Sequence, residues 1–586
     1  MRKYLTVRNL LFSILILAFL LRFWGVWNQD IFGDEAADAF RSIGYIDYLG
    51  TNFQTQPIDW YKTGPLPWWT KLSFHDFPPM AMIVQNIFFR IFGDSLSVAR
   101  LPAVVLGVIS VFLFYLIIKR LFSSESLALF SGFLFAISGA MVWIFRTSLL
   151  EPILLFFLIL NIYSFLLFLE NSAQGGSASG GKKYLVLSQS NGWWFFGATL
   201  GFVALTKYTG IFIIPVYFIY LIFLDIRCPK IEQYSGHRMS SILKNWRLYA
   251  APGLALLLFT PVIIYNIFLY KTTGHFDLQI AYLLGQNTPE WIGLVGKIQA
   301  PFSEIWKNLT ETYGIPLLLA SFLGLIYSFF EFYQVYKKKE RGKEGYIFFW
   351  LYFIFSTLLF VKIGSANRFL SLYGPVLVFF SASLADRFWN FSGTRRIKYA
   401  LQAVVIIFLI AELFFSVNKN FLKTSDYGIA KLDNYLAEEF KGKESAVIPE
   451  ADNIHLNEII YKFAAKKSEN AKRDLIMLVY NDNLALPTIQ WIFYRRFFYH
   501  NIPALYTENF IKILDQQGRG YFNPNNYPFK LYFIQSTENT LLNPFKTEKT
   551  IGADFEKWLQ EQGNQPVKII YGHDNLPMFR IYKFSI

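Results

Sequence analysis

The sequence contains very little cysteine and few charged residues. Cys228 is the single cysteine in a chain of 586 residues. One cysteine cannot form an internal disulfide, so an exported domain would have to be stabilised by its own core, and thiol chemistry is not expected. Charged residues make up only 16% of the chain, whereas soluble proteins average roughly 25%. This scarcity of charge argues against an ordinary soluble protein.

Apolar residues, by contrast, are abundant. Hydrophobic residues account for 54% of the chain and aromatic residues for 19%, and the mean hydropathy is +0.32. These values predict a polytopic membrane protein. The formal net charge is +14, but lysine and arginine occur mostly in short clusters between apolar runs. Such clusters are typical of membrane topology signals, so no nucleic-acid partner is expected.

The apolar runs predict about eleven membrane spans, because a helix needs roughly 20 apolar residues to cross the hydrocarbon core. The first run follows a basic N-terminus, is longer than a signal-peptide core and lacks a small-residue cleavage site, so we expect a retained first span. By run length, the predicted spans lie at about 9–27, 97–118, 126–146, 148–169, 193–206, 209–225, 248–270, 313–335, 345–362, 367–386 and 399–418.

Residues 78–92 are apolar but short, and they include Arg90. If this segment does not cross, the basic clusters at 119–120 and 337–341 and the Gly/Ser-rich linker at 175–183 fall on one face, whereas a crossing would reverse every later loop. The positive-inside rule therefore favours a segment that stays outside. It predicts a multi-pass protein of the cell membrane (inner or plasma membrane), with a cytoplasmic N-terminus and an extracytoplasmic C-terminal region.

From about residue 420 the composition becomes that of a soluble domain. Strand-like and helix-like stretches alternate, which predicts an α/β domain with a partly parallel sheet. We therefore expect a transmembrane domain at 1–419 and an extracytoplasmic α/β domain at 420–586. The predicted strands lie at 446–448, 475–480, 530–534 and 567–571, and the predicted helices near 454–466, 485–497 and 507–516.

Several polar residues lie at the external ends of the predicted spans. Ionisable groups at such depth are costly unless they are paired or functional. Simpler interpretations exist: Asp34 and Glu35 could cap a helix at 34–48, Glu151 could be a first-turn acid, and Lys207 could simply snorkel. The set comprises Asp34, Glu35, Asp38, His75, Asp76, Arg146, Glu151, Lys207, Lys362, Asn367 and Arg368.

Acids and bases converging on one face suit glycosyl transfer from a lipid phosphate. Lys207 and Arg368 are placed to hold the donor phosphate, where fixed cations stabilise the negative charge that builds as the sugar–phosphate bond breaks. Asp34 is the candidate general base for an acceptor hydroxyl. Direct displacement with one base would invert the anomeric centre.

The segment that contains His75 and Asp76 raises the question of metal binding. His75 and Asp76 could bind a divalent metal, but no fixed metal-ligand spacing is present. We therefore expect no required cofactor, with a divalent metal left open.

Four groups of residues resemble the membrane glycosyltransferases of the GT-C fold, in the group of protein O-mannosyltransferases and lipid A aminoarabinose transferases. Residues 33–36 (Gly-Asp-Glu-Ala) resemble the acidic motif of the first external loop, and 76–80 (Asp-Phe-Pro-Pro-Met) resemble the Pro-Pro motif. The passage from Gly93 to Pro152 is similar to the following spans. Residues 204–210 and 367–375 are similar to the later Lys and Arg motifs.

The resemblance covers about residues 10 to 390 and implies interfacial helices in the first loop. It implies Asp34 as catalytic base, Glu35 as an acceptor-binding or structural acid, and Lys207 and Arg368 as ligands of the donor phosphate, assisted by Arg146. The sequence departs from the family pattern at two places, and each involves a residue that we count among the acceptor-binding or structural acids. Glu151 stands where the family commonly has Asp, and Asp76-Phe77 replaces the usual residues before the Pro-Pro pair.

The predicted function is an inverting transferase that moves a single sugar from a polyprenyl-phosphate donor to a protein, lipid or glycan hydroxyl. One alternative is a transporter or flippase of lipid-linked sugars, although transporters normally keep their charges near the bilayer midplane in repeated halves. Another is an oligosaccharide ligase on the same fold. The expected partners are the lipid-linked donor, the acceptor and membrane lipids.

Overall fold

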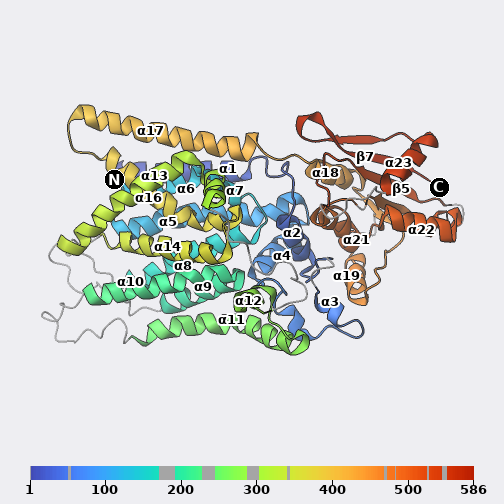
Figure 1. Cartoon of the computed structure of the whole chain (residues 1–586), viewed down its shortest axis with the longest axis horizontal. Helices are drawn as coiled ribbons and strands as arrows, with labels where there is room; N and C mark the ends of the chain where they lie inside the picture. Colours follow the sequence, from blue (N-terminus) through green and yellow to red (C-terminus); the bar gives the residue numbers. More distant parts are fainter. Residues whose placement is uncertain are drawn as a thin grey trace. The chain divides into compact units, whose positions relative to one another are not determined.

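The computed structural model separates into two compact units (Figure 1). The helical unit comprises residues 1–24, 71–81 and 100–423, and the mixed unit comprises 25–70, 82–99 and 424–586. The structure describes residues 2–50, 55–170, 192–227, 245–286, 302–338, 343–466, 472–481, 483–523, 527–543 and 551–585. The predicted linker at 175–183 and the basic residues 339–341 lie outside this part of the chain.

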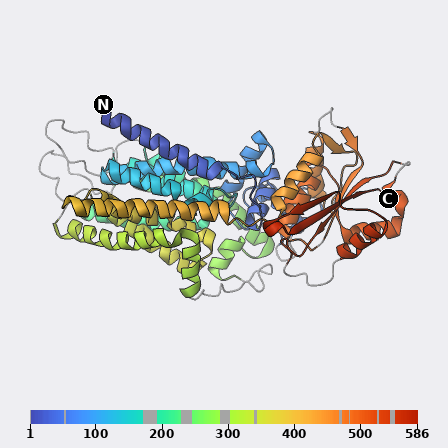
Figure 2. The same ribbon diagram turned by 90° about the horizontal axis from the view of Figure 1, so that it is seen from above.

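Long apolar helices build the helical unit, and Figures 1 and 2 show them running side by side. Within the described residues, eight helical stretches are long and apolar enough to cross a membrane. They are α1 (Arg2–Phe23), α5 (Leu96–Phe122), α8 (Leu150–Glu170), α11 (Trp246–Thr273), α13 (Phe302–Lys338), α14 (Gly345–Ile363), the run of α15 (Asn367–Leu370), η5 (Ser371–Tyr373) and α16 (Gly374–Trp389), and α17 (Arg395–Val417), which continues into η6 (Asn418–Leu422).

Shorter helices complete the unit: α6 (Glu125–Ile137), α7 (Gly139–Ile144), α9 (Gly192–Thr206), η2 (Tyr208–Phe212), α10 (Ile213–Arg227) and α12 (Leu278–Leu284). Three of them, α6, α9 and α10, coincide with predicted spans but are shorter than a typical crossing. The predicted class of polytopic helical membrane protein is confirmed. The number of eleven spans stays a prediction.

In the span predicted at 126–146, the helix breaks at Ser138 into α6 and α7. That this segment crosses the membrane stays a prediction. Polar groups of α17 and the turn after it stabilise the break. The Glu412 carboxylate accepts a hydrogen bond from the Gly139 amide at 3.1 Å, and the Asn420 side-chain amide donates to the Gly139 carbonyl at 3.1 Å. These partners satisfy backbone groups that an interrupted helix leaves open.

Helix α13 begins at Phe302, before the span that the sequence predicts at 313–335. It kinks at Gly314, where φ is +73°. A side chain is excluded there, because a Cβ at this position would lie 2.8 Å from the ring of Phe415 on α17. The predicted span at 313–335 is therefore the part of α13 after the kink.

The first part of the mixed unit consists of short helices. They are α2 (Asp34–Gly44), α3 (Pro57–Trp60), η1 (Trp68–Lys71, which crosses the division between the units) and α4 (Met80–Phe92, whose residues from Met82 belong to this unit). Helix α4 has 13 residues, fewer than a bilayer crossing requires, which agrees with the prediction that 78–92 does not cross. Helix α2 ends four residues earlier than predicted, because Tyr45 adopts a left-handed conformation at φ 51°.

The remainder of the mixed unit is an α/β fold, with helices on both sides of a sheet in Figure 2. A five-stranded sheet has the order β4-β3-β5-β7-β6, in which β3 pairs in parallel with β4 and β5, and β7 pairs antiparallel with β5 and β6. The strands are β1 (Lys443–Ser445), β2 (Lys472–Asp474), β3 (Ile476–Tyr480), β4 (Ala504–Tyr506), β5 (Lys530–Ser536), β6 (Lys568–Tyr571) and β7 (Pro577–Phe584). The helices are α18 (Ile429–Glu439), α19 (Ile454–Ala464), α20 (Leu486–Ile489), η7 (Gln490–Tyr494), α21 (Arg495–Tyr499), α22 (Thr507–Gln517), η8 (Arg519–Phe522), α23 (Ile551–Glu561) and η10 (His573–Asn575).

The C-terminal α/β prediction is confirmed in outline. The strands predicted at 475–480, 530–534 and 567–571 correspond to β3, β5 and β6, and the three predicted helices are present. The strand predicted at 446–448 is wrong: the short strand β1 precedes it and pairs in parallel with β2. The boundary predicted at residue 420 stays a prediction, because a unit defined by contacts is not a test of independent folding.

Alternating residues of the central strands feed two cores, because successive side chains of a strand point to opposite faces. In β3, Leu478 and Tyr480 lie in one core while Met477 and Val479 lie in the other. The first core also contains Phe40 of α2 and residues of α4, α18 and α19. The first-loop helices and the C-terminal sheet therefore share one hydrophobic core.

Polar contacts reinforce this shared core. The Asp30 carboxylate accepts hydrogen bonds from the amides of Tyr427 and Ala430, the latter at 2.7 Å, at the beginning of α18. A carboxylate is favoured at this end of a helix, where amide groups lack intrahelical partners. Asp30 thus ties the segment that precedes α2 to a helix about 400 residues later in the chain.

A buried cluster in the same unit centres on Asp433 of α18. Its carboxylate accepts hydrogen bonds from Arg495 and, at 2.7 Å, from Arg496. Although burial acts in the opposite direction, these two guanidinium groups lower the pKa of Asp433. Arg495 also donates to the backbone carbonyl of Asp94, which links the turn after α4 to α21.

We expect replacement of Asp30 by alanine to destabilise the mixed unit by about 2 kcal/mol, because two amides at the N-terminus of α18 lose a charged acceptor. The measurement is chemical and thermal denaturation of the purified full-length protein in detergent. Asp515→Ala, at an exposed acid of α22, is the matched control and should leave stability unchanged. Equal stability of the two variants would show that the hydrogen bonds from Asp30 to α18 do not stabilise the unit.

Candidate functional site

A buried ion pair joins two of the predicted site residues in the helical unit. Lys207 lies in an extended turn between α9 and η2, and Glu151 lies in the first turn of α8. The Lys207 Nζ is 2.6 Å from Glu151 Oε1, and the side chains are 9% and 2% exposed. Buried charges of this kind persist only when they are paired. The position of Glu151 at a helix N-terminus favours its negative charge further.

Arg368 is the second cation near the same carboxylate. It belongs to the short helix α15, and its Nε is 3.9 Å from Glu151 Oε1. Its side chain is 32% exposed, so part of the guanidinium remains accessible. Two cations therefore lie beside one carboxylate. Such a group is suited to binding an additional anion.

Aromatic rings hold the two cations in place. The ring of Phe369 lies 4.8 Å from Lys207 Nζ and 4.9 Å from Arg368 Cζ, measured to the ring centroid. The ring of Phe77 lies 5.8 Å from Lys207 Nζ. Cations are attracted to aromatic faces at these distances. Phe77 and the buried Asp76 belong to the segment that contains the two prolines. This segment therefore contacts Lys207, and both belong to the helical unit.

A second polar network, which the sequence analysis missed, supports the turn after Lys207. Asp277 caps α12 through the amides of Gln279 and Ile280, and its carboxylate accepts hydrogen bonds from the Tyr208 hydroxyl at 2.5 Å and the Asn266 amide at 2.8 Å. Burial raises the pKa of Asp277, while the hydrogen bond from Tyr208 acts in the opposite direction. Asp277 directly precedes a short apolar run, which is an N-cap signal that could have been found in the sequence.

The same network reaches His75. The Leu278 amide donates to the His75 carbonyl at 2.9 Å, and the ring centroids of His75 and His275 are 5.5 Å apart. Both histidines are buried. Over the described ranges, no three or more His, Cys, Asp and Glu side chains are grouped as metal ligands.

Arg146 is buried at a different place in the helical unit. Its Nη1 donates to the carbonyls of Leu21 and Trp24 at 2.9 and 2.8 Å, at the C-terminal end of α1, and its guanidinium lies 4.5 Å from the ring centroid of Phe421. A cation at a helix C-terminus compensates the carbonyl groups left open there.

The predicted base lies in the mixed unit, whereas Glu151, Lys207 and Arg368 lie in the helical unit. Asp34 is the first residue of α2 and is exposed, while Glu35 and Asp38 are buried. Helix α2 begins after Gly33, whose φ of +58° favours glycine. The convergence of Asp34 with the two cations stays a prediction.

Comparison with known families finds a match over part of the chain. Residues 76–181 match the family described as dolichyl-phosphate-mannose-protein mannosyltransferase. The resemblance to GT-C membrane glycosyltransferases is confirmed. The matched residues run from Asp76 of the Pro-Pro motif beyond Glu151, and they therefore include Arg146 and one partner of the buried ion pair.

Solved structures are also similar to the chain at low sequence identity. The oligosaccharyltransferase AglB from Archaeoglobus fulgidus is 14% identical, with a TM-score of 0.49 over 91% of this chain and 70% of that chain. ArnT from Cupriavidus metallidurans, bound to undecaprenyl phosphate, is 11% identical, with a TM-score of 0.47 over 97% of both chains. The Pmt1-Pmt2 complex of S. cerevisiae is 18% identical, with a TM-score of 0.31 over 45% of this chain and 33% of that chain. No curated protein sequence matches the chain.

We expect Glu151→Ala to destabilise the helical unit by about 3–5 kcal/mol, because Lys207 would remain buried without its carboxylate. Chemical denaturation of the purified protein in detergent measures this loss. The double variant Glu151→Ala/Lys207→Met removes both charges and should recover most of the stability. If the single variant is as stable as the unmodified protein, or the double variant is no better than the single one, the buried pair does not have this role.

Proposed function

We propose that this protein transfers a single sugar, with inversion, from a polyprenyl-phosphate donor to a hydroxyl group of a protein, lipid or glycan. The observation that supports this most directly is the pair of cations, Lys207 and Arg368, beside the single carboxylate of Glu151. The match to a family of transferases that use a lipid-phosphate sugar agrees with this chemistry.

The two cations suit the donor phosphate. A sugar-phosphate-lipid is a phosphodiester with one negative charge, and the departing lipid phosphate gains a second charge as the bond to the sugar breaks. Preorganised cations stabilise that second charge most strongly in the transition state. Arg368, which is partly exposed, would contact the phosphate oxygens. Lys207 would add a fixed charge, held in position by Glu151 and the ring of Phe369.

Asp34 is the proposed general base. It is exposed at the beginning of α2, so its carboxylate is accessible to an acceptor. The acceptor oxygen would attack the anomeric carbon as the bond between that carbon and the phosphate oxygen breaks, and the hydroxyl proton would pass to Asp34. One displacement of this kind inverts the anomeric centre. The buried acids Glu35 and Asp76 would orient the acceptor or the loop that carries it.

We also propose that the reaction takes place on the extracytoplasmic face of the cell membrane. The basic clusters between the predicted spans support a cytoplasmic N-terminus and an extracytoplasmic C-terminal region. The short helix α4, which has too few residues to cross, agrees with this topology. Residues 420–586 would then form an extracytoplasmic α/β domain beside the first external loop, with which they share a hydrophobic core.

We expect Asp34→Asn to reduce sugar transfer by about 10²- to 10⁴-fold, because asparagine cannot accept the acceptor proton. The donor KM should change little, since the donor ligands remain. The measurement is incorporation of radiolabelled sugar by the purified protein, supplied with candidate polyprenyl-phosphate sugars and membrane extract. Asp515→Asn, at an exposed acid of the same unit, is the matched control. Full activity of Asp34→Asn would rule out this base.

A further inference from the structure

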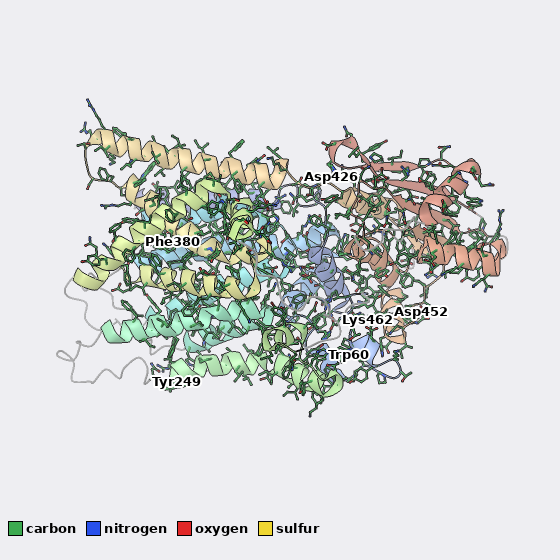
Figure 3. All side chains as sticks on the ribbon, viewed as in Figure 1. Trp60, Tyr249, Phe380, Asp426, Asp452 and Lys462 are labelled. Carbon is green, nitrogen blue, oxygen red and sulfur yellow. The ribbon has the colours of Figure 1, made fainter. Side chains whose placement is uncertain are left out.

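The mixed unit contains a cleft that the proposed transfer reaction does not use. It has a volume of about 500 Å³ and is formed by the ends of α2 and α4 together with α19 and α21. All of its lining residues belong to the mixed unit. Lys462, labelled in Figure 3, lies on α19 at this cleft. The proposed donor ligands, Lys207 and Arg368, belong instead to the helical unit.

Positive charge dominates the cleft. Arg90, Lys462 and Lys466 line it and are exposed. In the described part of the chain, none of these three forms an ion pair with an acid. The one acid in the lining, Asp94, is 2.7 Å from His500 Nε2. Three cations against one carboxylate leave an excess of two positive charges, with His500 counted as neutral.

The floor of the cleft is aromatic and firmly packed. The rings of Phe463 and Tyr499 meet edge to face at 4.9 Å, and Lys466 Nζ lies 5.5 Å from the Phe463 ring centroid. Tyr499 donates a hydrogen bond from its hydroxyl to the Phe40 carbonyl at 3.3 Å and packs directly on Gly44, where a Cβ would lie 2.7 Å from the hydroxyl oxygen. The cleft therefore has a preformed apolar floor beneath a cationic rim.

We propose that this cleft binds a phosphorylated ligand, with the phosphoryl group held by Arg90, Lys462 and Lys466 and the adjoining apolar part of the ligand lying against Phe463 and Tyr499. A phosphomonoester carries a charge of about −1.5 to −2 at neutral pH, which matches the excess charge of the cleft better than a single carboxylate would. The planar guanidinium of Arg90 can bind two phosphate oxygens at once, and the lysines add compact charges. A few polar groups above an apolar floor are typical of ligand sites.

The phosphomonoester could belong to a lipid headgroup or to a soluble sugar phosphate, and the test has one arm for each source. The full-length protein is placed in phosphatidylcholine nanodiscs and titrated with glucose 6-phosphate by isothermal titration calorimetry. In the second arm, the nanodiscs contain phosphatidic acid, and native mass spectrometry counts the lipid that remains bound after extraction.

The variant Lys462→Gln/Lys466→Gln removes two charges from the rim, and Arg90→Gln removes the third. The matched control, Lys512→Gln/Lys557→Gln, removes two charges from exposed lysines of α22 and α23 in the same unit. We expect the cleft variants to bind at least tenfold more weakly in the arm where the unmodified protein binds, with the control unchanged. Glucose without phosphate should not bind, and thermal denaturation verifies that each variant is folded.

Specific binding of glucose 6-phosphate alone identifies a soluble ligand, and retention of phosphatidic acid alone identifies a headgroup. Either result, or both, supports the phosphate site. Binding in neither arm, or equal binding by cleft and control variants, overturns it. Sugar transfer is measured separately in the same variants, so a failure of the cleft proposal is distinguishable from a failure of the transferase proposal.

Discussion

The buried ion pair between Glu151 and Lys207 is the interaction on which the candidate site depends. Each charge would be costly to bury alone, and together they fix the turn after α9 against the first turn of α8. Arg368 approaches the same carboxylate from α15. One acid therefore contacts two cations and holds them in place. This arrangement would present both cations, already positioned, to the proposed donor phosphate.

The second constraint lies in the mixed unit, where the helix that carries Asp34 is part of a larger fold. Phe40 of α2 lies in the same core as the C-terminal sheet, and Asp30 caps α18. The segment from Asp30 to α4 is therefore shaped by residues near the other end of the chain. We expect a change in the C-terminal sheet to disturb the proposed base without contacting it.

Much of the fold could be predicted from the sequence, because span length and strand-sized apolar runs are local signals. The failures occurred where distant residues decide the structure. The break at Ser138 depends on Glu412 and Asn420, which lie more than 270 residues further along the chain. Strand β7 was missed because Arg580 and Lys583 interrupt its apolar pattern. In the fold, Arg580 is paired with Glu556 on α23, at 2.6 Å.

The candidate site was also predictable only in part, because local signals identify its residues but not the contacts between them. The sequence placed Glu151, Lys207 and Arg368 at the same predicted membrane face. Their ion pairs could not be predicted, because they join segments that are far apart in the sequence. Asp277 was overlooked because a short capped helix inside a loop does not stand out in a hydropathy pattern. Asn266 lies inside α11, within the apolar run predicted as the span at 248–270.

The most direct test of the central claim is the structure of the product. The purified full-length protein is incubated with a polyprenyl-phosphate sugar and membrane extract, and the modified molecule is analysed by mass spectrometry and by NMR of its new glycosidic bond. The account predicts a gain of one sugar with the anomeric configuration opposite to that of the donor, together with release of the polyprenyl phosphate. A retained configuration, a gain of many sugar units, or no transfer from any such donor would contradict it.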